Sequence, residues 1–144
     1  MIMKPLIKFN RGFAAIEMVI ATPILLFFLI LVLELGNMMI HYNVISKSVQ
    51  NGARYAVSEV YGTKGGTLAP SSEIQNVVVY GQNTAGTAIL SNLVVSDVTI
   101  SPPNTDSYVR VSVTYNYIPH FVSIPFSSAS FSIPISVSSI MRVL

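Results

Sequence analysis

Hydrophobic residues form an almost continuous run near the start of the chain. From Phe13 to Leu33 only Glu17 and Thr22 interrupt it, and the last sixteen residues of the run carry no charge. A helix rises about 1.5 Å per residue, so the run spans roughly 31 Å, close to a bilayer core of about 30 Å. We therefore predict a transmembrane helix over residues 13–34.

Helical spacing of apolar residues continues beyond this run. Over residues 35–60 they recur three and four positions apart, with polar side chains on the opposite face. No proline interrupts the stretch, so we predict an amphipathic continuation of the same helix, with an apolar stripe for packing against a sheet. The stripe consists of Leu35, Met38, Met39, Tyr42, Ile45, Val49, Ala53, Ala56, Val57 and Val60, and the polar face of Asn37, Lys47, Ser48, Gln50, Asn51 and Arg54.

Alternating patterns predict strands in the C-terminal part. Apolar and polar residues alternate most clearly from Val109 to Tyr117. Strands over about 94–101 and 107–118 are expected to form an antiparallel hairpin. A third strand is expected from Phe131 to Val137, where Pro134 confines it to an edge or a bulge.

A short helix is expected between the long helix and the strands. Ser71 or Ser72 can cap a helix around Glu73–Tyr80, and Gly81–Gly86 then forms a loop. Together these elements predict an α+β fold with a globular domain over residues 61–144. In it the long N-terminal helix packs on a small antiparallel sheet of about three or four strands.

Composition and charge place part of the chain in lipid. The sequence is 51% hydrophobic and 10% charged, which is too apolar for an ordinary soluble surface. Three of the eight basic residues, Lys4, Lys8 and Arg11, precede Gly12. The rest of the chain has five basic and six acidic residues. Basicity therefore belongs to residues 1–12 and gives no support for nucleic-acid binding.

Cysteine is absent, which excludes a disulfide framework and a cysteine-bearing metal site.

The basic leader and the apolar run have the outline of a secretory signal peptide. The small-residue cleavage pattern after the run is missing, because the chain continues Glu34-Leu35-Gly36-Asn37. We therefore expect the run to stay attached as an anchor. The leader charges hold the N-terminus in the cytoplasm, so the C-terminal domain faces outward.

Glu17 is the exception within the run. A carboxylate that faces lipid costs roughly 2.5–3.5 kcal/mol, so this residue requires a partner or a role. Residues 11–17, Arg-Gly-Phe-Ala-Ala-Ile-Glu, resemble a prepilin peptidase site, and the stretch that continues to Pro23 is similar to the start of the TadE family of pilin-like proteins. Further similarity to that family lies in Val44–Ala56, Ile74–Gly81 and Val137–Arg142.

The resemblance implies a pilin-like fold and a specific processing event. In such proteins a membrane aspartyl protease, the prepilin peptidase, cuts after the glycine, which here is Gly12, and Glu17 becomes the fifth residue of the mature chain. Major Flp-type pilins carry tyrosine after the glutamate, whereas Met18 follows here. This departure indicates a minor, pseudopilin-like subunit, and both a TadE-like and a TadF-like role stay open.

The physical consequences of such a cut can be argued from the residues themselves. Glycine lets the backbone extend into a protease groove, and cleavage removes all leader charges while it creates an α-amine on Phe13. This amine and Glu17 carry opposite charges about one helical turn apart. In an assembly, the carboxylate of an incoming subunit can pair with the amine of its neighbour and set the register. The alternative is that Glu17 only snorkels at the membrane surface.

Pro23 lies inside the predicted membrane helix. Proline frees the carbonyl four residues before it, that of Val19, so a local kink is expected. Thr22 or a neighbouring helix can satisfy that carbonyl in lipid. Pro23 is then either the bend of an ordinary kinked anchor or a weak point that matters when the helix leaves the membrane.

Residues for chemistry are sparse. The Gly-rich stretch 61–70 lacks the Gly-Lys-Ser/Thr order of a phosphate cradle. His41 and His120 have no acidic neighbour in a recognised motif, so we expect a surface or interface position for each. No His-Glu-x-x-His, Ser-x-x-Lys or Gly-x-Ser-x-Gly order occurs. We expect no enzyme activity, no cofactor and no metal site.

Three functions remain in view. The first is a minor pilin or pseudopilin of a Tad-type (type IVc) pilus, cut after Gly12, stored in the inner membrane and assembled through residues 13–60 to support pilus assembly, adhesion or secretion. The second is a permanent single-pass inner-membrane component of the secretion machinery, and the third is an adhesive module at a fibre tip. The expected partners are the prepilin peptidase, other minor pilins, the major pilin, the inner-membrane assembly platform and membrane lipid, with no nucleic acid.

Overall fold

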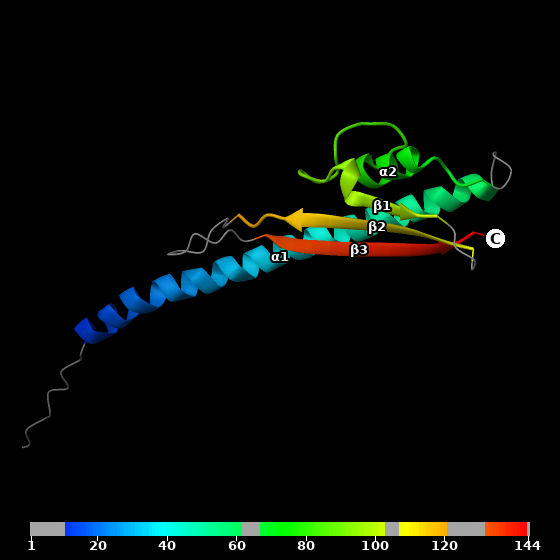
Figure 1. Ribbon diagram of the computed structural model, residues 1–144. Coiled ribbons are helices and arrows are strands. Elements are labelled where there is room, and N and C mark those ends of the chain that lie inside the picture. Colours follow the sequence, from blue (N-terminus) through cyan, green and yellow to red (C-terminus); the bar gives the residue numbers. More distant parts are fainter. Residues whose placement is uncertain (1–10, 62–66, 103–106, 121–131, 144) are drawn as a thin grey trace, which may run out of the picture. The chain divides into compact units, whose positions relative to one another are not determined.

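The computed structural model describes residues 11–61, 67–102, 107–120 and 132–143. The leader up to residue 10, most of the Gly-rich loop, the turn of the predicted hairpin and Phe131 lie outside these residues. The elements in chain order are α1 (Arg11–Tyr61), α2 (Ser71–Tyr80), the 3-10 turn η1 (Val95–Asp97), β1 (Val98–Ser101), β2 (Tyr108–Tyr117) and β3 (Ile133–Arg142) (Figure 1). The predicted α+β arrangement, a long apolar helix and an antiparallel sheet, is confirmed.

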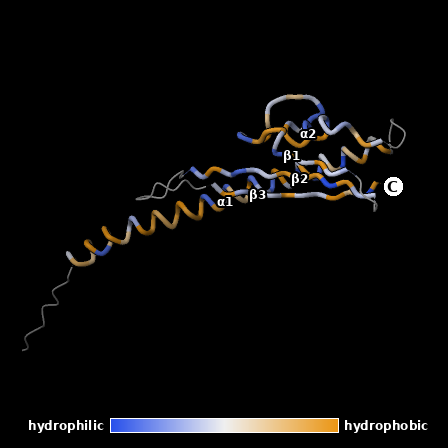
Figure 2. The backbone as a smooth tube through the Cα atoms, in the orientation of Figure 1, coloured by the Kyte–Doolittle hydropathy of each residue, from blue (hydrophilic) through white to orange (hydrophobic). Residues whose placement is uncertain are grey.

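The chain divides after Gly36 into two compact units. The first holds the apolar part of α1, where hydrophobic residues occupy nearly every turn (Figure 2). The second starts at Asn37 and holds the rest of α1, α2 and the sheet. Among the described residues, the buried core belongs to the second unit.

The sheet has three antiparallel strands in the order β1-β2-β3. Val113, in the middle of β2, lies opposite Val98 of β1 and Val137 of β3. The predicted alternation along β2 is confirmed, since its odd-numbered side chains are buried and its even-numbered ones point to the other face. β1 is shorter than predicted because residues 95–97 form η1, in which the Asp97 carboxylate accepts a hydrogen bond of 3.1 Å from the Val94 N–H.

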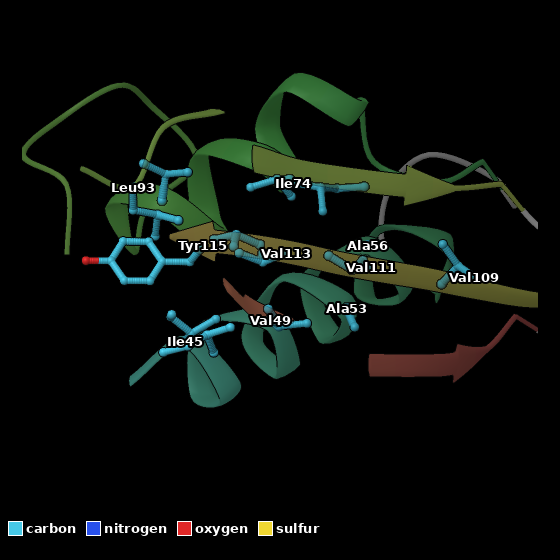
Figure 3. Packing of buried hydrophobic residues seen from close by; sticks show 14 of the residues in the cluster. Ile45, Val49, Ala53, Ala56, Ile74, Leu93, Val109, Val111, Val113 and Tyr115 are labelled. Atoms are coloured by element: carbon cyan, nitrogen blue, oxygen red, sulfur yellow. The ribbon is translucent and has the colours of Figure 1, made fainter. Parts of the chain in front are cut away.

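The core lies between the second part of α1 and one face of the sheet. Ile45, Val49, Ala53 and Ala56 of α1 are fully buried and pack under the buried side chains of β2 (Figure 3). The predicted stripe is right from Ile45 to Val57 and at Met38, which packs against the core, and wrong at three members that are half or more exposed. These are Leu35, Met39 and Tyr42.

Ser48 is a second correction to the predicted helix faces. It was assigned to the polar face, yet only 5% of it is exposed. Ser48 and Gly52 are four residues apart, so they lie on one side of the helix, and Gly52 approaches Val78 of α2. Helix α1 therefore buries a second side, which includes the small residues Ser48 and Gly52 that a hydrophobicity pattern does not reveal.

Backbone groups and not side chains define the ends of α2. The Pro70 carbonyl accepts hydrogen bonds from the N–H groups of Glu73 (2.9 Å) and Ile74 (3.1 Å), and no serine side chain caps the helix. The predicted serine cap is wrong because Pro70, whose φ is −53°, already holds the turn that starts the helix. Gly81 ends α2 with a φ of 74°, a left-handed conformation that suits glycine.

The predicted edge position of Pro134 is confirmed. Strand β3 lies at the border of the sheet, and Pro134 is opposite Asn116 without a break in the register. The strand runs further than predicted, to Arg142. Its inward side chains are less covered than those of β2, and among them only Ile135, 7% exposed, is buried.

Candidate processing and assembly site

Gly12 and Phe13 lie in the first turn of α1, and the described part of the chain leaves them uncovered. No other group comes within 4 Å of a Cβ placed on Gly12, and 73% of Phe13 is exposed. Because the first N–H groups of a helix have no intrahelical acceptor, this turn opens at low cost. A protease therefore has steric access to the Gly12–Phe13 bond once the turn unwinds.

Glu17 lies four residues after Phe13 and therefore on the same side of α1. Its side chain is exposed. Among the residues that the structure describes, it makes no hydrogen bond and no ion pair. The carboxylate is thus surrounded by apolar side chains of its own helix and has no partner within the described chain.

Thr22 and Pro23 sit in the interior of α1, and the helix continues through the proline. The Thr22 hydroxyl donates a hydrogen bond of 2.6 Å to the carbonyl of Met18. The expectation that the Thr22 hydroxyl bonds to the carbonyl of Val19 is therefore wrong. A threonine hydroxyl in a helix reaches the carbonyl four residues back, and for Thr22 that residue is Met18.

The surface around these residues is apolar and uncovered. α1 is the one helix among the described residues that is long and apolar enough to cross a membrane, and no part of its most apolar stretch is buried. Large hydrophobic side chains that are at least half exposed occur on every turn of this part. They include Ile16, Met18, Val19, Ile20, Ile24, Leu25, Leu26, Phe27, Phe28 and Leu29. Such a surface requires lipid or other apolar helices around it.

His41 belongs to an aromatic cluster in the second unit. Its ring centroid lies 5.0 Å from that of Tyr117 and 5.9 Å from that of Tyr115. The Tyr115 hydroxyl is 3.4 Å from His41 Nδ1 and donates a 3.1 Å hydrogen bond to the Ser91 carbonyl. Burial raises the pKa of Tyr115 above its ordinary value of 10.0. His41 is half-buried, so it packs in the fold more than the sequence suggested.

The remaining candidate residues do not form a second site among the described residues. His120 is exposed and follows the end of β2. Within the described ranges, no group of three or more His, Asp or Glu residues is placed to hold a metal ion. Among the described residues, we therefore take Gly12, Phe13 and Glu17 as the candidate site, because they combine an exposed helix start with a carboxylate in an apolar helix.

Residues 12–54 match the family model described as TadE-like protein. This segment is TadE-like. The matched segment contains Gly12, Phe13, Glu17 and Pro23, and it continues into the buried helix positions of the second unit. No curated protein and no solved structure gives a significant match. The match likens this segment to TadE-like proteins, and α1 is long and apolar enough to cross a membrane.

Proposed function

We propose that this TadE-like chain is a minor pilin or pseudopilin subunit of a Tad-type (type IVc) pilus, made as a single-pass inner-membrane precursor and cut after Gly12. The observation that carries the proposal is the position of Glu17. It is an exposed carboxylate within an apolar helix, one turn beyond an open Gly12–Phe13 bond, and it lacks a partner among the described residues.

Processing would change the charges at this end of the helix. In the precursor, Arg11 and Gly12 belong to the first turn of α1, which must unwind to enter a protease groove. The cut then leaves Phe13 with a cationic amine, and α1 starts there. Glu17 lies close to the new N-terminus, where a negative charge is favourable by about 0.3–1 kcal/mol at an exposed position.

Assembly would use the same two charges between subunits. The Glu17 carboxylate of one subunit pairs with the Phe13 amine of its neighbour while the exposed apolar side chains of the two helices pack together. Removing one member of such a buried pair strands the other, at a cost of roughly 3–5 kcal/mol. The pair would therefore select the register in which helices join, with other minor pilins and the major pilin as neighbours. This role involves no catalysis and no cofactor.

The test is the mass of the mature N-terminus after coexpression with a prepilin peptidase. We expect an intact mass that begins at Phe13. Gly12→Val should leave the precursor uncut, whereas Gly36→Val, the same change at the other open glycine of α1, should be processed normally. A wild-type mass that retains Met1 would exclude the proposal.

The alternative to a pilus subunit is a permanent membrane component of the same system, and experiments can distinguish the two. Such an anchor would be insensitive to Gly12→Val and absent from sheared surface fibres, because it never leaves the membrane. An incorporated subunit should be found in the sheared fraction, and Gly12→Val should remove it from there. A tip-located adhesive module would also be sheared, and it would in addition bind surfaces through its folded unit.

A further inference from the structure

Among the described residues, none pairs its backbone with the outer border of the sheet at β3. The Val143 N–H donates a 2.6 Å hydrogen bond to the Ser107 carbonyl, so the odd-numbered residues of this end of the chain face β2. Because backbone groups alternate along a strand, the even-numbered residues Ser136, Ser138 and Ile140 direct N–H and C=O away from the sheet. Pro134, which has no N–H, falls on the same outward side.

The opposite border of the sheet is covered. By the same alternation, Val98 of β1 directs its carbonyl outward, and the Gln75 side chain of α2 donates a 3.2 Å hydrogen bond to it. Helix α2 packs along β1. No described residue covers the β3 border in the way that α2 covers β1. Within the described ranges the two borders therefore differ, because a helix packs along β1, whereas β3 offers a row of hydrogen-bonding groups to another strand.

Four exposed side chains gather at one end of β2 and β3 on the face of the sheet opposite α1. Arg110 lies opposite Ile140, and Tyr108 lies opposite Arg142. Ile140 is 51% and Tyr108 42% exposed. The two arginines are diagonal neighbours across the strands, about 7–8 Å apart. Neither arginine forms an ion pair within the described part of the chain, so this arginine patch has the charge and the residue types of a surface that binds an acidic partner.

We propose that the β3 border binds an extended acidic segment of a different protein. The segment adds as a fourth strand, its backbone pairs with the outward groups of Ser136, Ser138 and Ile140, and its carboxylates reach Arg142 and Arg110. A second copy of this chain does not fit, because the three strands contain no aspartate or glutamate. The inference rests on the sheet alone and holds whether or not the chain is cut after Gly12.

The experiment uses the full chain in nanodiscs of zwitterionic lipid and two fluorescent ten-residue peptides. In both peptides valine occupies every other position. The positions between the valines hold glutamate and threonine in the first peptide, and lysine and threonine in the second. Fluorescence anisotropy should show the glutamate peptide binding at least about tenfold more tightly than the lysine peptide. A glutamate peptide with N-methylated backbone amides should bind at least about tenfold more weakly than the unmodified one.

Two variants separate strand addition from charge attraction. Ser138→Pro removes an outward N–H that β2 does not use, so it should abolish binding, whereas Ser138→Ala keeps that N–H and should bind normally. Arg110→Gln together with Arg142→Gln should remove the preference for glutamate over lysine. Equal binding of both peptides to the wild type, or unchanged binding by Ser138→Pro, would overturn the proposal. So would a dimer of this chain that Ser138→Pro dissociates and the peptides do not.

Discussion

Gly52 of α1 lies directly against Val78 of α2, so close that a methyl group on Gly52 would overlap Val78 Cγ2. Val78 is itself fully buried, and it has little room to move. The contact fixes the approach of the two helices, and it explains a glycine in the middle of α1, where this residue costs about 1 kcal/mol relative to alanine.

Gly52→Ala is expected to destabilise the folded unit by about 1–3 kcal/mol, because the added methyl overpacks the contact. Gly36→Ala is the matched control, since nothing lies within 4 Å of the added group. It should be neutral or stabilise the helix by up to about 1 kcal/mol. Chemical denaturation in detergent measures both values.

Combining Gly52→Ala with Val78→Ala should give less destabilisation than the sum of the two single changes. The smaller residue at position 78 makes room for the new methyl, and a coupling energy of about 1 kcal/mol is expected for residues in contact. Strict additivity of the two effects would contradict the assigned contact.

Tyr55→Phe tests the second link between these helices. The Tyr55 hydroxyl donates a 2.7 Å hydrogen bond to Glu73 Oε2, and both side chains are half-buried. Loss of the hydroxyl should lower the free energy of unfolding by about 1 kcal/mol. Tyr42→Phe, at an exposed position on the same helix, should change it by less than about 0.5 kcal/mol.

The folded unit should lose stability when the pH rises above about 10, because of Tyr115. Burial raises the pKa of this tyrosine in the folded state above 10.0, its ordinary value. Between the two pKa values the unfolded chain loses the phenolic proton and the folded chain retains it, so unfolding becomes more favourable as pH rises. Below pH 10 the contribution is fully present. Tyr115→Phe should flatten the decline, and a wild-type curve that Tyr115→Phe leaves unchanged would argue against this assignment.

Glu17→Gln should abolish pilus assembly while the Gly12–Phe13 bond is still cut. The amide keeps the size of the side chain but cannot neutralise the amine of a neighbouring subunit. Glu34→Gln, at the other end of the apolar run, is the control and should assemble. The readout is the amount of the chain in sheared surface fibres together with the mass of its N-terminus. Normal assembly by Glu17→Gln would show that the carboxylate has no role in register.

Much of the fold follows from local patterns. The alternation along β2 predicted the buried face of that strand because each apolar residue there, from Val109 to Tyr117, meets the core. The run from Phe13 to Leu33 predicted the exposed apolar helix, and Pro134 predicted an edge strand. In each case the pattern and the tertiary environment impose the same requirement.

The errors come from contacts between distant residues. Ser48 is buried on the side of the helix where Gly52 meets Val78, although nothing in the helix period sets this serine apart from other polar residues. Tyr115 and His41 meet across 74 residues of sequence, so their hydrogen-bonding distance could not be read from spacing. The candidate site was predicted as a whole from the sequence, because Gly12, Phe13 and Glu17 are adjacent and need no tertiary contact to come together.

The modest cover on β3 bears on how its backbone exchanges with solvent. β2 is hydrogen-bonded on both sides and buries all its odd-numbered side chains, whereas β3 pairs on one side with β2 and buries only Ile135 well. The amide hydrogens of β3 therefore exchange with solvent through local opening, ahead of those that need global unfolding. The C-terminal strand is thus expected to exchange its outward amide hydrogens while its inward ones stay paired with β2.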